Sequence, residues 1–448
     1  MLTRRTMIRR TAVAAGFLGL PRLLARVDAS IPSPYGPLAP KRDEESTGVF
    51  LALPPDFRYR VLSGANDLLD DGNRSPRNPD GMAVFRVGNE LRLVRNHEIR
   101  EATLPLSPGP WSYDAMGGGG TTTIVVDPNT RATVRRFVSL SGTSANCAGG
   151  PTPWGSWLSC EETVAGIGAF AKHHGYCFEV AAAADTAVVA TPLPSLGRFV
   201  HEAAAVDPET SIIYLTEDQD RAGLYRCIPH QPGVLAAGGR LQMLAVRNAT
   251  TYDAASGQTI GRRLPVTWVD IPNPDPPNAS TNPSAVFDQG RARGGTRFRR
   301  LEGAWFADGS LFFTSTTGGS SALGQVWQYR PPSTHKRRSV GTQSEGDLTL
   351  LFESTAIDVL RLPDNLTLSP RGAIVVCEDP EPAPAFLRVI TSEGHIFPLA
   401  QNIAHGFGPV STELAGATFS PDGETLFVNL FGPGLTLAIW GPWELGPV

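Results

Sequence analysis

The segment Gly142–Thr163 carries the densest chemistry of the chain. It reads GTSANCAGGPTPWGSWLSCEET and contains two cysteines, two tryptophans and a pair of adjacent glutamates. Residues 149–153 predict a turn, and residues 154–160 predict a strand that ends on Glu161 and Glu162. Two carboxylates at a strand end are costly to desolvate unless a cation lies between them and other acids. We therefore expect the rest of the chain to bring further acids to this place.

Cys147 is expected on a glycine-flanked loop just ahead of this strand. A core cysteine normally lies within an apolar strand, as Cys377 does in the sequence IVVCED. A loop cysteine is better placed to reach a metal ion as a thiolate, although a purely structural thiol stays open on the residues alone.

One pattern recurs six times after Phe50. An apolar strand is followed by a turn rich in Gly, Pro, Asp or Asn, and then by a second strand that ends in polar or acidic residues. Six hairpins with a common plan predict an all-β fold, a six-bladed β-propeller with loop insertions, and unrelated hairpins in a sandwich or barrel are the alternative. The copies are Asp80–Glu98, Gly149–Glu162, His201–Asp218, Leu301–Thr316, Asp364–Asp379 and Leu414–Asn429.

Acids occupy corresponding places in these copies, at the start of a first strand or at the end of a second strand. In an antiparallel hairpin these two places lie at the same open end, so blades around one axis would gather the acids at one mouth of a channel. Metal ions are the natural counter-charge for such a ring, whereas the alternative is that each acid caps its own turn. The acids are Glu202, Glu302 and Asp364 at strand starts, and Glu98, Glu162, Glu217 and Asp379 at strand ends.

Arg300 precedes Glu302 by two residues, and alternate residues of a strand share a face. If Glu302 binds a metal ion, the Arg300 guanidinium lies beside the bound cations. A fixed positive fork in that place suits an anion, above all phosphate. A simple ion pair between Arg300 and Glu302 is the alternative.

The N-terminal residues 1–29 predict a twin-arginine signal peptide. Thr3–Arg9 carries the arginine pair, Thr11–Leu20 is modestly apolar, and Val27–Ala29 offers a cleavage site. An ordinary basic tail is the alternative. Removing these residues moves the formal charge from −4 to about −9, which argues against nucleic acid as a partner and favours cations. We expect export by the twin-arginine machinery to the periplasm or the exterior, without stable membrane insertion.

The remaining chain is expected to form one domain. Residues 30–49 predict an extended leader, and residues 50–448 predict the propeller. An insertion at about 228–295 interrupts it and includes a Pro-, Asn- and Ser-rich stretch at Pro272–Phe287. We expect this stretch to cover the mouth of the channel.

Taken together, these segments resemble the PhoX-type alkaline phosphatases over most of the chain after residue 50. Each motif alone is weakly specific, and the combination is highly specific. The motifs are RNHE at Arg95–Glu98, NCAGGPTPWGSWLSCEE at Asn146–Glu162, RFVHEAAAVDP at Arg198–Pro208, RLEGAWFADG at Arg300–Gly309, PDNLTLSP at Pro363–Pro370, and the closing FSPDGETLFVN and AIWGPW.

The resemblance implies a twin-arginine-exported propeller that holds iron and calcium ions and cleaves small phosphate monoesters. Arg300 would be the phosphate clamp and Glu302 the second catalytic residue. The chain departs from many members at Val428–Gly434, which reads VNLFGPG and lacks the His and Gln that those members carry before Pro-Gly. The implied ligands are Cys147, Glu162, Glu202 and Glu302 for iron and shared ions, and Glu98, Asp364, Glu378 and Asp379 for calcium.

Two other functions fit an acidic propeller. One is a calcium-dependent lactonase or esterase, for which a single calcium ion would suffice. The other is a non-catalytic binding propeller. Neither has an evident need for Cys147 or for Arg300, so these two residues discriminate between the three hypotheses.

Overall fold

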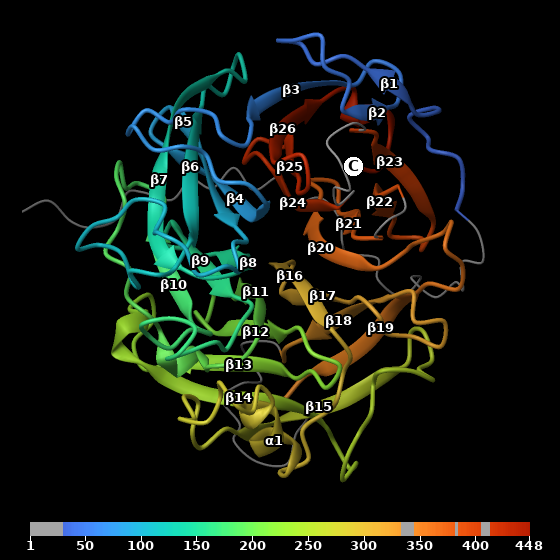
Figure 1. Cartoon of the computed structure of the whole chain (residues 1–448). Coiled ribbons are helices and arrows are strands. Elements are labelled where there is room, and N and C mark those ends of the chain that lie inside the picture. Colours follow the sequence, from blue (N-terminus) through green and yellow to red (C-terminus); the bar gives the residue numbers. More distant parts are fainter. Residues whose placement is uncertain (1–29, 333–344, 381–383, 405–412) are drawn as a thin grey trace, which may run out of the picture.

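The computed structural model describes residues 30–332, 345–380, 384–404 and 413–448. The chain is an all-β protein whose sheets stand in a ring around one axis, a propeller-like arrangement (Figure 1). The expected signal peptide lies outside the described residues. Among the residues that are described, no helix has the length and apolar character needed to cross a membrane.

Each of the six hairpins expected from the sequence is an antiparallel strand pair. The first strands of the pairs contact one another in turn and close a ring around the axis. The pairs are β4 (Pro79–Val87) with β5 (Glu90–His97), β8 (Asn146–Pro151) with β9 (Ser156–Glu161), β11 (His201–Val206) with β12 (Ile213–Glu217), β16 (Leu301–Ala307) with β17 (Ser310–Ser315), β20 (Pro363–Leu368) with β21 (Ile374–Glu378), and β24 (Leu414–Phe419) with β25 (Leu426–Leu430).

Further strands extend these pairs outward. The outer strands are β6 (Gly119–Val126), β7 (Thr133–Thr143), β10 (Cys177–Ala181), β13 (Leu224–Pro229), β14 (Gly239–Val246), β18 (Gln325–Arg330), β19 (Asp347–Glu353), β22 (Phe386–Ile390), β23 (Ile396–Asn402) and β26 (Leu435–Trp440).

Hydrogen bonding groups the described strands into five sheets, so the expectation of six separate blades is wrong. The cause is β15 (Arg263–Asp270), which belongs to the insertion and pairs with β14 on one edge and β19 on the other. It joins β11–β14 and β16–β19 into one nine-stranded sheet. A pattern of separate hairpins carries no information about a strand that bridges two of them.

Strands from the start of the chain complete the last two sheets. β3 (Arg58–Ser63) pairs with β26, which closes the ring between the two ends of the chain. β1 (Ala39–Lys41) pairs with β2 (Leu51–Leu53), and β2 pairs with β23. The stretch expected as a leader therefore contributes a short strand to a sheet.

The rest of the insertion includes one helix and the Pro-, Asn- and Ser-rich stretch. Helix α1 (Ala285–Arg291) lies at the periphery in Figure 1. In the stretch expected over the mouth, the Pro274 carbonyl accepts a hydrogen bond from the Arg198 amide at 2.8 Å, and Asp275 accepts one from the Tyr176 hydroxyl at 3.1 Å. These contacts fix the stretch against the region of β10 and β11, and its covering of the mouth stays a prediction.

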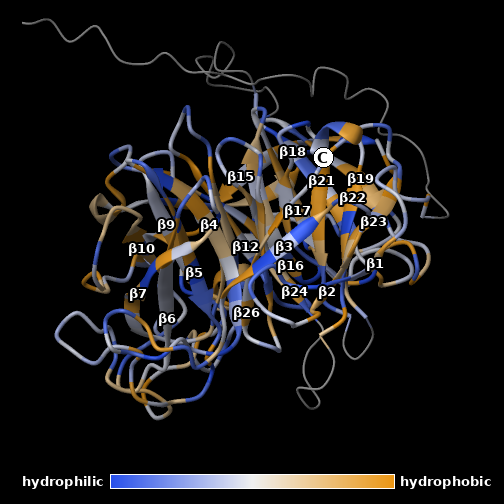
Figure 2. Ribbon diagram, turned by 90° about the horizontal axis from the view of Figure 1, so that it is seen from above, coloured by the Kyte–Doolittle hydropathy of each residue, from blue (hydrophilic) through white to orange (hydrophobic). Residues whose placement is uncertain are grey.

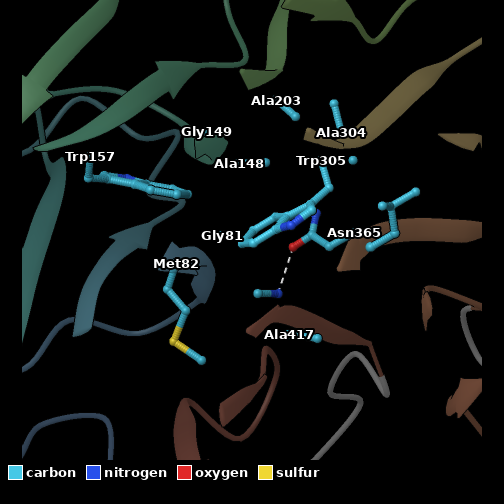
Figure 3. Close-up of a pocket in the computed structure, with 13 residues that line it drawn as sticks. Gly81, Met82, Ala148, Gly149, Trp157, Ala203, Ala304, Trp305, Asn365 and Ala417 are labelled. Atoms are coloured by element: carbon cyan, nitrogen blue, oxygen red, sulfur yellow. Dashed lines mark hydrogen bonds between the residues drawn. The ribbon is translucent and has the colours of Figure 1, made fainter. Parts of the chain in front are cut away.

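The apolar core lies between neighbouring sheets, where strand residues interdigitate. Much of the strand ribbon is hydrophobic when the ring is seen from the side (Figure 2). Around the axis, glycines and alanines of the first strands lie together with larger side chains such as Trp305 and Asn365 (Figure 3). A Cβ added to Gly81 would lie 2.6 Å from the Ala148 Cα, and one added to Gly303 would lie 2.6 Å from the Asn365 Cα. The cavity there has a volume of about 20 Å³, room for a single water molecule, so the axis is not an open pore.

Candidate metal centre at the mouth of the ring

A β-bulge recurs in the first strand of all six hairpins and places side chains at the mouth. In a bulge two residues oppose one, which re-aims the side chains of the bulged strand. In five hairpins the first bulged residue carries a carboxylate or a thiol, whereas the sixth bulge holds Gly416 and Ala417 and offers no such donor. The five residues are Asp80, Cys147, Glu202, Glu302 and Asp364.

A second set of acids comes directly after the second strands. Glu98 follows β5, Glu162 follows β9, Asp218 follows β12 and Asp379 follows β21. Because the end of a second strand lies beside the start of its partner, both sets reach the same end of the ring.

The two sets merge into one cluster. Four groups of ligand-type atoms have all their atoms within 4.8 Å of one another, and each group shares a residue with another. The mouth cluster, as we call it, therefore runs without a break from the first hairpin to the fifth. The groups are Asp80, Glu98 and Cys147; Cys147, Glu162 and Glu202; Glu202, Glu302 and Asp364; and Asp80, Asp364 and Glu413.

Two carboxylates of the mouth cluster have buried oxygens for which the described part of the chain supplies no hydrogen-bond partner. Glu202 is fully buried, and neither of its carboxylate oxygens has a hydrogen-bond partner; Oδ1 of Asp80 is in the same position. Burial, followed by the neighbouring acids Glu302 and Asp364, raises the pKa of Glu202 well above its ordinary value. Burial likewise raises the pKa of Glu162 to about 7 and that of Asp80 to about 6. Bound cations are the counter-charge that removes this cost, so the residues present fit metal ions.

Cys147 supplies the single soft donor of the mouth cluster. It belongs to β8 rather than to a loop, and the bulge is what turns it to the mouth. Its Sγ lies 3.1 Å from Oδ2 of Asp80. Burial and the surrounding carboxylates raise the pKa of the thiol well above its ordinary value. A thiolate among carboxylates suits an iron-type ion better than calcium alone.

Arg300 lies at the edge of the mouth cluster, immediately before β16. Its backbone has φ of 45°, a left-handed conformation that is unfavourable for arginine and that clusters at functional sites. Nε and Nη2 donate to the two carboxylate oxygens of Asp218 at 2.8 and 3.0 Å, and Nη2 also donates to Glu302 at 2.9 Å. The side chain is 37% exposed, so the guanidinium is oriented by two acids while still reaching solvent.

Arg100 holds a comparable place on the other side of Glu162. Its Nη2 pairs with Glu98 at 2.5 Å and also with the Glu162 carboxylate. More than half of the Arg100 side chain is exposed. The mouth cluster is therefore flanked by two guanidiniums, of which the sequence analysis identified only Arg300.

The structure does not bring Glu378 into the mouth cluster. Its carboxylate accepts hydrogen bonds from the Arg361 and Phe386 amides at 3.0 and 3.1 Å, and from Nε of Arg388 at 3.0 Å. The next residue, Asp379, raises the pKa values of Asp80 and Asp364 through its charge. The side chain expected to reach the mouth is thus that of Asp379, and the expectation for Glu378 is wrong in position.

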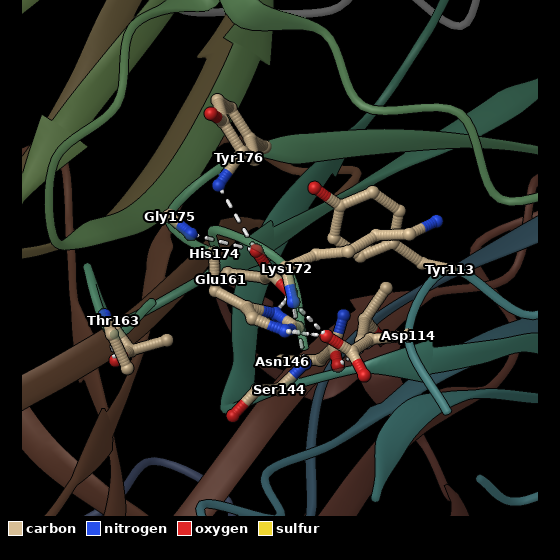
Figure 4. Close-up of polar contacts among 12 residues, drawn as sticks. Tyr113, Asp114, Ser144, Asn146, Glu161, Thr163, Lys172, His174, Gly175 and Tyr176 are labelled. Carbon is tan, nitrogen blue, oxygen red and sulfur yellow. Dashed lines mark hydrogen bonds and ion pairs between the residues drawn. The ribbon is translucent and has the colours of Figure 1, made fainter. Parts of the chain in front are cut away.

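At other second strands, too, the last residue of the strand is hydrogen-bonded within the protein rather than directed to the mouth. Glu217 turns away from the mouth cluster, and its Oε2 accepts bonds from the Gly223 amide and the Tyr225 hydroxyl. Glu161 accepts a bond from Nδ1 of His174 at 2.6 Å, and it also accepts bonds from three backbone amides (Figure 4). Burial opposes a charge on His174, but the Glu161 and Asp114 carboxylates outweigh it and raise the pKa of His174.

Sequence reasoning missed four members of this site. Asp80 and Gly81 match Glu302 and Gly303 in the repeat, a signal that was present in the sequence. Asp218 directly follows β12, just as Glu162 directly follows β9, so the two acids occupy the same place in the repeat. Neither Glu413 nor Arg100 has such a signal, because each lies outside the repeated pattern. The four are Asp80, Arg100, Asp218 and Glu413.

Comparisons with known proteins bear on the family and the fold of this chain. A model of the family "Alkaline phosphatase PhoX" matches residues 119–434. Pseudomonas fluorescens PhoX, solved in complex with vanadate, a transition state analogue, has a TM-score of 0.68 and 18% sequence identity, and the match covers 95% of this chain and 99% of that chain. XC5397, a gluconolactonase from Xanthomonas campestris, has a TM-score of 0.36 and 13% identity over 85% of this chain and 100% of that chain.

No curated protein matches the sequence. The family match spans more than two thirds of the chain and includes Cys147, Glu162, Glu202, Arg300, Glu302 and Asp364. The resemblance noted from the sequence motifs is confirmed, and the chain belongs to the alkaline phosphatase PhoX family.

Proposed function

We propose that this chain is a metal-dependent phosphomonoesterase that releases inorganic phosphate at the mouth cluster. The observation that carries the proposal is the placement of Arg300. Its guanidinium is held by Asp218 and Glu302 beside a group of buried carboxylates, two of which have oxygens without a hydrogen-bond partner. A site that gathers cations next to a fixed arginine is suited to a dianionic phosphate ester.

The donor set supports iron together with calcium. Cys147 offers a thiolate next to Glu162 and Glu202, a mixture of soft and hard donors that suits iron. Glu98, Asp364 and Asp379 offer only oxygens, which suits calcium. Bound ions supply Lewis acidity, neutralising phosphate oxygens and activating an attacking oxygen. Glu302 belongs to one of these groups and also holds Arg300, so it couples the metal centre to the phosphate clamp.

The residues of the chain itself account for binding and orientation. Asp218 occupies Nε and Nη2 of Arg300, and among the described residues no hydrogen-bond partner of Nη1 is found. Nη1 is therefore the donor that remains for a non-bridging phosphate oxygen. Because Asp218 fixes the guanidinium plane before substrate binds, little reorganisation is needed as charge develops in the transition state.

The proposed setting is the periplasm or the exterior of the cell. The twin-arginine pattern in residues 1–29 supports export of a folded, metal-loaded protein. Small phosphate esters are the proposed substrates, and the acidic mature chain argues against nucleic acid. A calcium-dependent lactonase would leave both Cys147 and Arg300 without a purpose, and the family match favours the phosphatase.

Substitution of Arg300 tests the proposal. We expect Arg300→Ala to keep its metal ions and its melting temperature but to lose on the order of 10²–10³-fold in rate, the usual cost of removing one preorganised donor. Arg300→Lys restores only part of the rate, because an ammonium group cannot keep the two parallel bonds to Asp218 and also place a donor where Nη1 lies. The assay is turnover of a chromogenic phosphomonoester with calcium present, with a lactone and a carboxylic ester as controls, and with iron and calcium measured by elemental analysis.

Arg299→Ala is the matched control. Arg299 is the neighbouring residue, is 41% exposed and pairs with Asp220 at 3.2 Å on the surface. We expect it to behave as wild type. If Arg300→Ala hydrolyses the phosphoester as fast as Arg299→Ala, the proposed mechanism is wrong.

A further inference from the structure

A second group of ligand-type atoms lies apart from the mouth cluster and shares no residue with it. Cys160 of β9, Cys177 of β10 and His201 of β11 place two thiols and one imidazole nitrogen within 4.8 Å of one another. All three side chains have no exposure to solvent. The surrounding cluster is apolar, with Leu158 and Phe199 among its members. Neither the phosphatase chemistry nor the mouth cluster uses these donors.

The spacing of the three atoms matches a metal coordination shell. The Sγ atoms of Cys160 and Cys177 are 3.4 Å apart, and Sγ of Cys177 lies 3.6 Å from Nδ1 of His201. A tetrahedral zinc ion with Zn–S of ~2.3 Å and Zn–N of ~2.0–2.1 Å separates two sulfurs by ~3.8 Å and a sulfur from a nitrogen by ~3.5 Å. Both separations therefore come within a few tenths of an ångström of a zinc site.

The tautomer of His201 is set correctly for metal binding. Its Nε2 lies 2.9 Å from the Gly197 carbonyl oxygen, which can only accept a hydrogen bond, so Nε2 carries the proton. Nδ1 then presents its lone pair toward the Cys177 thiol. The ring of Phe199 lies against the imidazole, with centroids 3.7 Å apart and an angle of 30° between the planes, and restricts its rotation. A backbone carbonyl bound to the distal nitrogen is a usual second partner of a metal-binding histidine.

We propose that Cys160, Cys177 and His201 bind a thiophilic divalent ion of the zinc type, with a structural rather than a catalytic purpose. On binding, the two thiols release two protons, and the two thiolates with the neutral imidazole make an uncharged complex with the ion, as an apolar site requires. The three protein donors leave the fourth position of a tetrahedral ion to a water molecule or another small ligand, which would be enclosed with the ion because the donors are buried.

The ion would join two sheets. β9 and β10 belong to the three-stranded sheet, which is the smallest of the five, whereas β11 opens the nine-stranded sheet. A metal bridge between them would stabilise the sheet that has the fewest ladder hydrogen bonds. It would also fix β9, which leads into Glu162, and β11, in which Glu202 directly follows His201.

The first experiment uses the wild-type protein and does not depend on any variant folding. Elemental analysis of protein purified without added zinc is expected to show about one zinc per chain. A mercurial thiol reagent, monitored with a zinc-responsive dye under mild denaturation, is expected to release that zinc. Intact-mass measurement decides between the alternatives, because Cys160 and Cys177 are directly opposite in the β9–β10 ladder. A mass 2 Da lower that rises on reduction would show a disulfide, and zinc-free protein with free thiols would show an ordinary core; either result overturns the proposal.

The second experiment locates the ion. Cys177→Ser is expected to lose the zinc and several degrees of melting temperature, whereas Cys227→Ser is the matched control. Cys227 is also buried in the same apolar cluster but belongs to no group of ligand-type atoms. Replacement of the ion by Co²⁺ should give thiolate charge-transfer bands in wild type and in Cys227→Ser but not in Cys177→Ser. Equal zinc in all three proteins would place the ion elsewhere and contradict the assignment.

Discussion

Neighbouring acids at the ends of the second strands face two different environments. Glu161, Glu217 and Glu378 are the last residues of β9, β12 and β21, and each accepts hydrogen bonds from backbone amides or from Tyr, His or Arg side chains. The residues that follow them, Glu162, Asp218 and Asp379, turn to the mouth. There, Glu202 and Asp80 have buried oxygens that accept no hydrogen bond from any described residue.

The hydrogen bonding of these acids indicates which of them are structural and which are candidate metal ligands. Both kinds are buried, and both come from the same repeat, so burial and position in the motif do not separate them. The supply of hydrogen-bond donors separates Glu161 and Glu378 from Glu202, because a carboxylate that already accepts two or three protein donors has little left to offer a cation. Glu217 is intermediate, since its Oε2 accepts two bonds whereas its buried Oε1 has no partner among the described residues. Substitutions of acids from both environments test this distinction.

The largest effect is expected from Glu202→Gln. Its carboxylate belongs to two of the four groups in the mouth cluster, so we expect loss of metal ions and a fall in activity of more than about 100-fold, which exceeds the usual cost of losing an outer-shell partner. The measurement is metal content by elemental analysis alongside phosphomonoester turnover. Glu161→Gln is the paired control, because the Glu161 carboxylate already accepts protein hydrogen bonds on both oxygens. Equal metal loss in both variants would show that hydrogen bonding does not distinguish structural acids from metal ligands.

The next largest effect is expected from Cys147→Ser. The variant should lose iron, together with any thiolate charge-transfer absorption, while calcium and the fold persist, because serine is a poor replacement for a thiolate ligand. Cys377→Ser, in β21, should instead lower the melting temperature and leave iron unchanged. Wild-type iron content in Cys147→Ser would show that the thiol has a structural purpose only.

A smaller effect is expected from Asp218→Asn. The asparagine amide has only one acceptor oxygen, so the bidentate interaction with Arg300 is lost. The guanidinium is then less well oriented. We expect a loss of about 10–100-fold in kcat with metal content retained. The control is Asp220→Asn, since Asp220 pairs with Arg299 on the surface, where such ion pairs contribute little. Similar kinetics in the two variants would remove Asp218 from the site.

The smallest effect on activity is expected from Glu378→Gln. Glu378 is buried against Arg388 and serves the packing of β21 on β22. We expect a loss of about 1–3 kcal/mol in the free energy of unfolding, from weakened buried hydrogen bonds, with turnover per bound metal unchanged. Chemical denaturation and metal analysis check this. Calcium loss without destabilisation would return Glu378 to the ligand set.

The fold was largely accessible from the sequence because strand alternation and turn residues mark each hairpin locally. The five donors at the bulges were harder. A bulge changes the parity of the first strand, so alternation cannot tell whether Asp364 or Asn365 of β20 reaches the mouth. Arg100 and Glu413 come from segments without a repeated pattern, and only the closed ring brings them to the site. The bridging strand β15 was hidden because its partners, β14 and β19, are far apart in the chain.

The pairing of β3 with β26 sets a condition on when this protein can finish folding. The two strands are separated by almost the whole chain, so the last contact in the ring cannot form until synthesis has reached Trp440. Contacts of such sequence separation form slowly, and until then both strands present open edges. A ribosome-bound chain, or one truncated before Trp440, therefore remains an open arc with unpaired strand edges at both ends. The ring can therefore close only in a chain that includes β26.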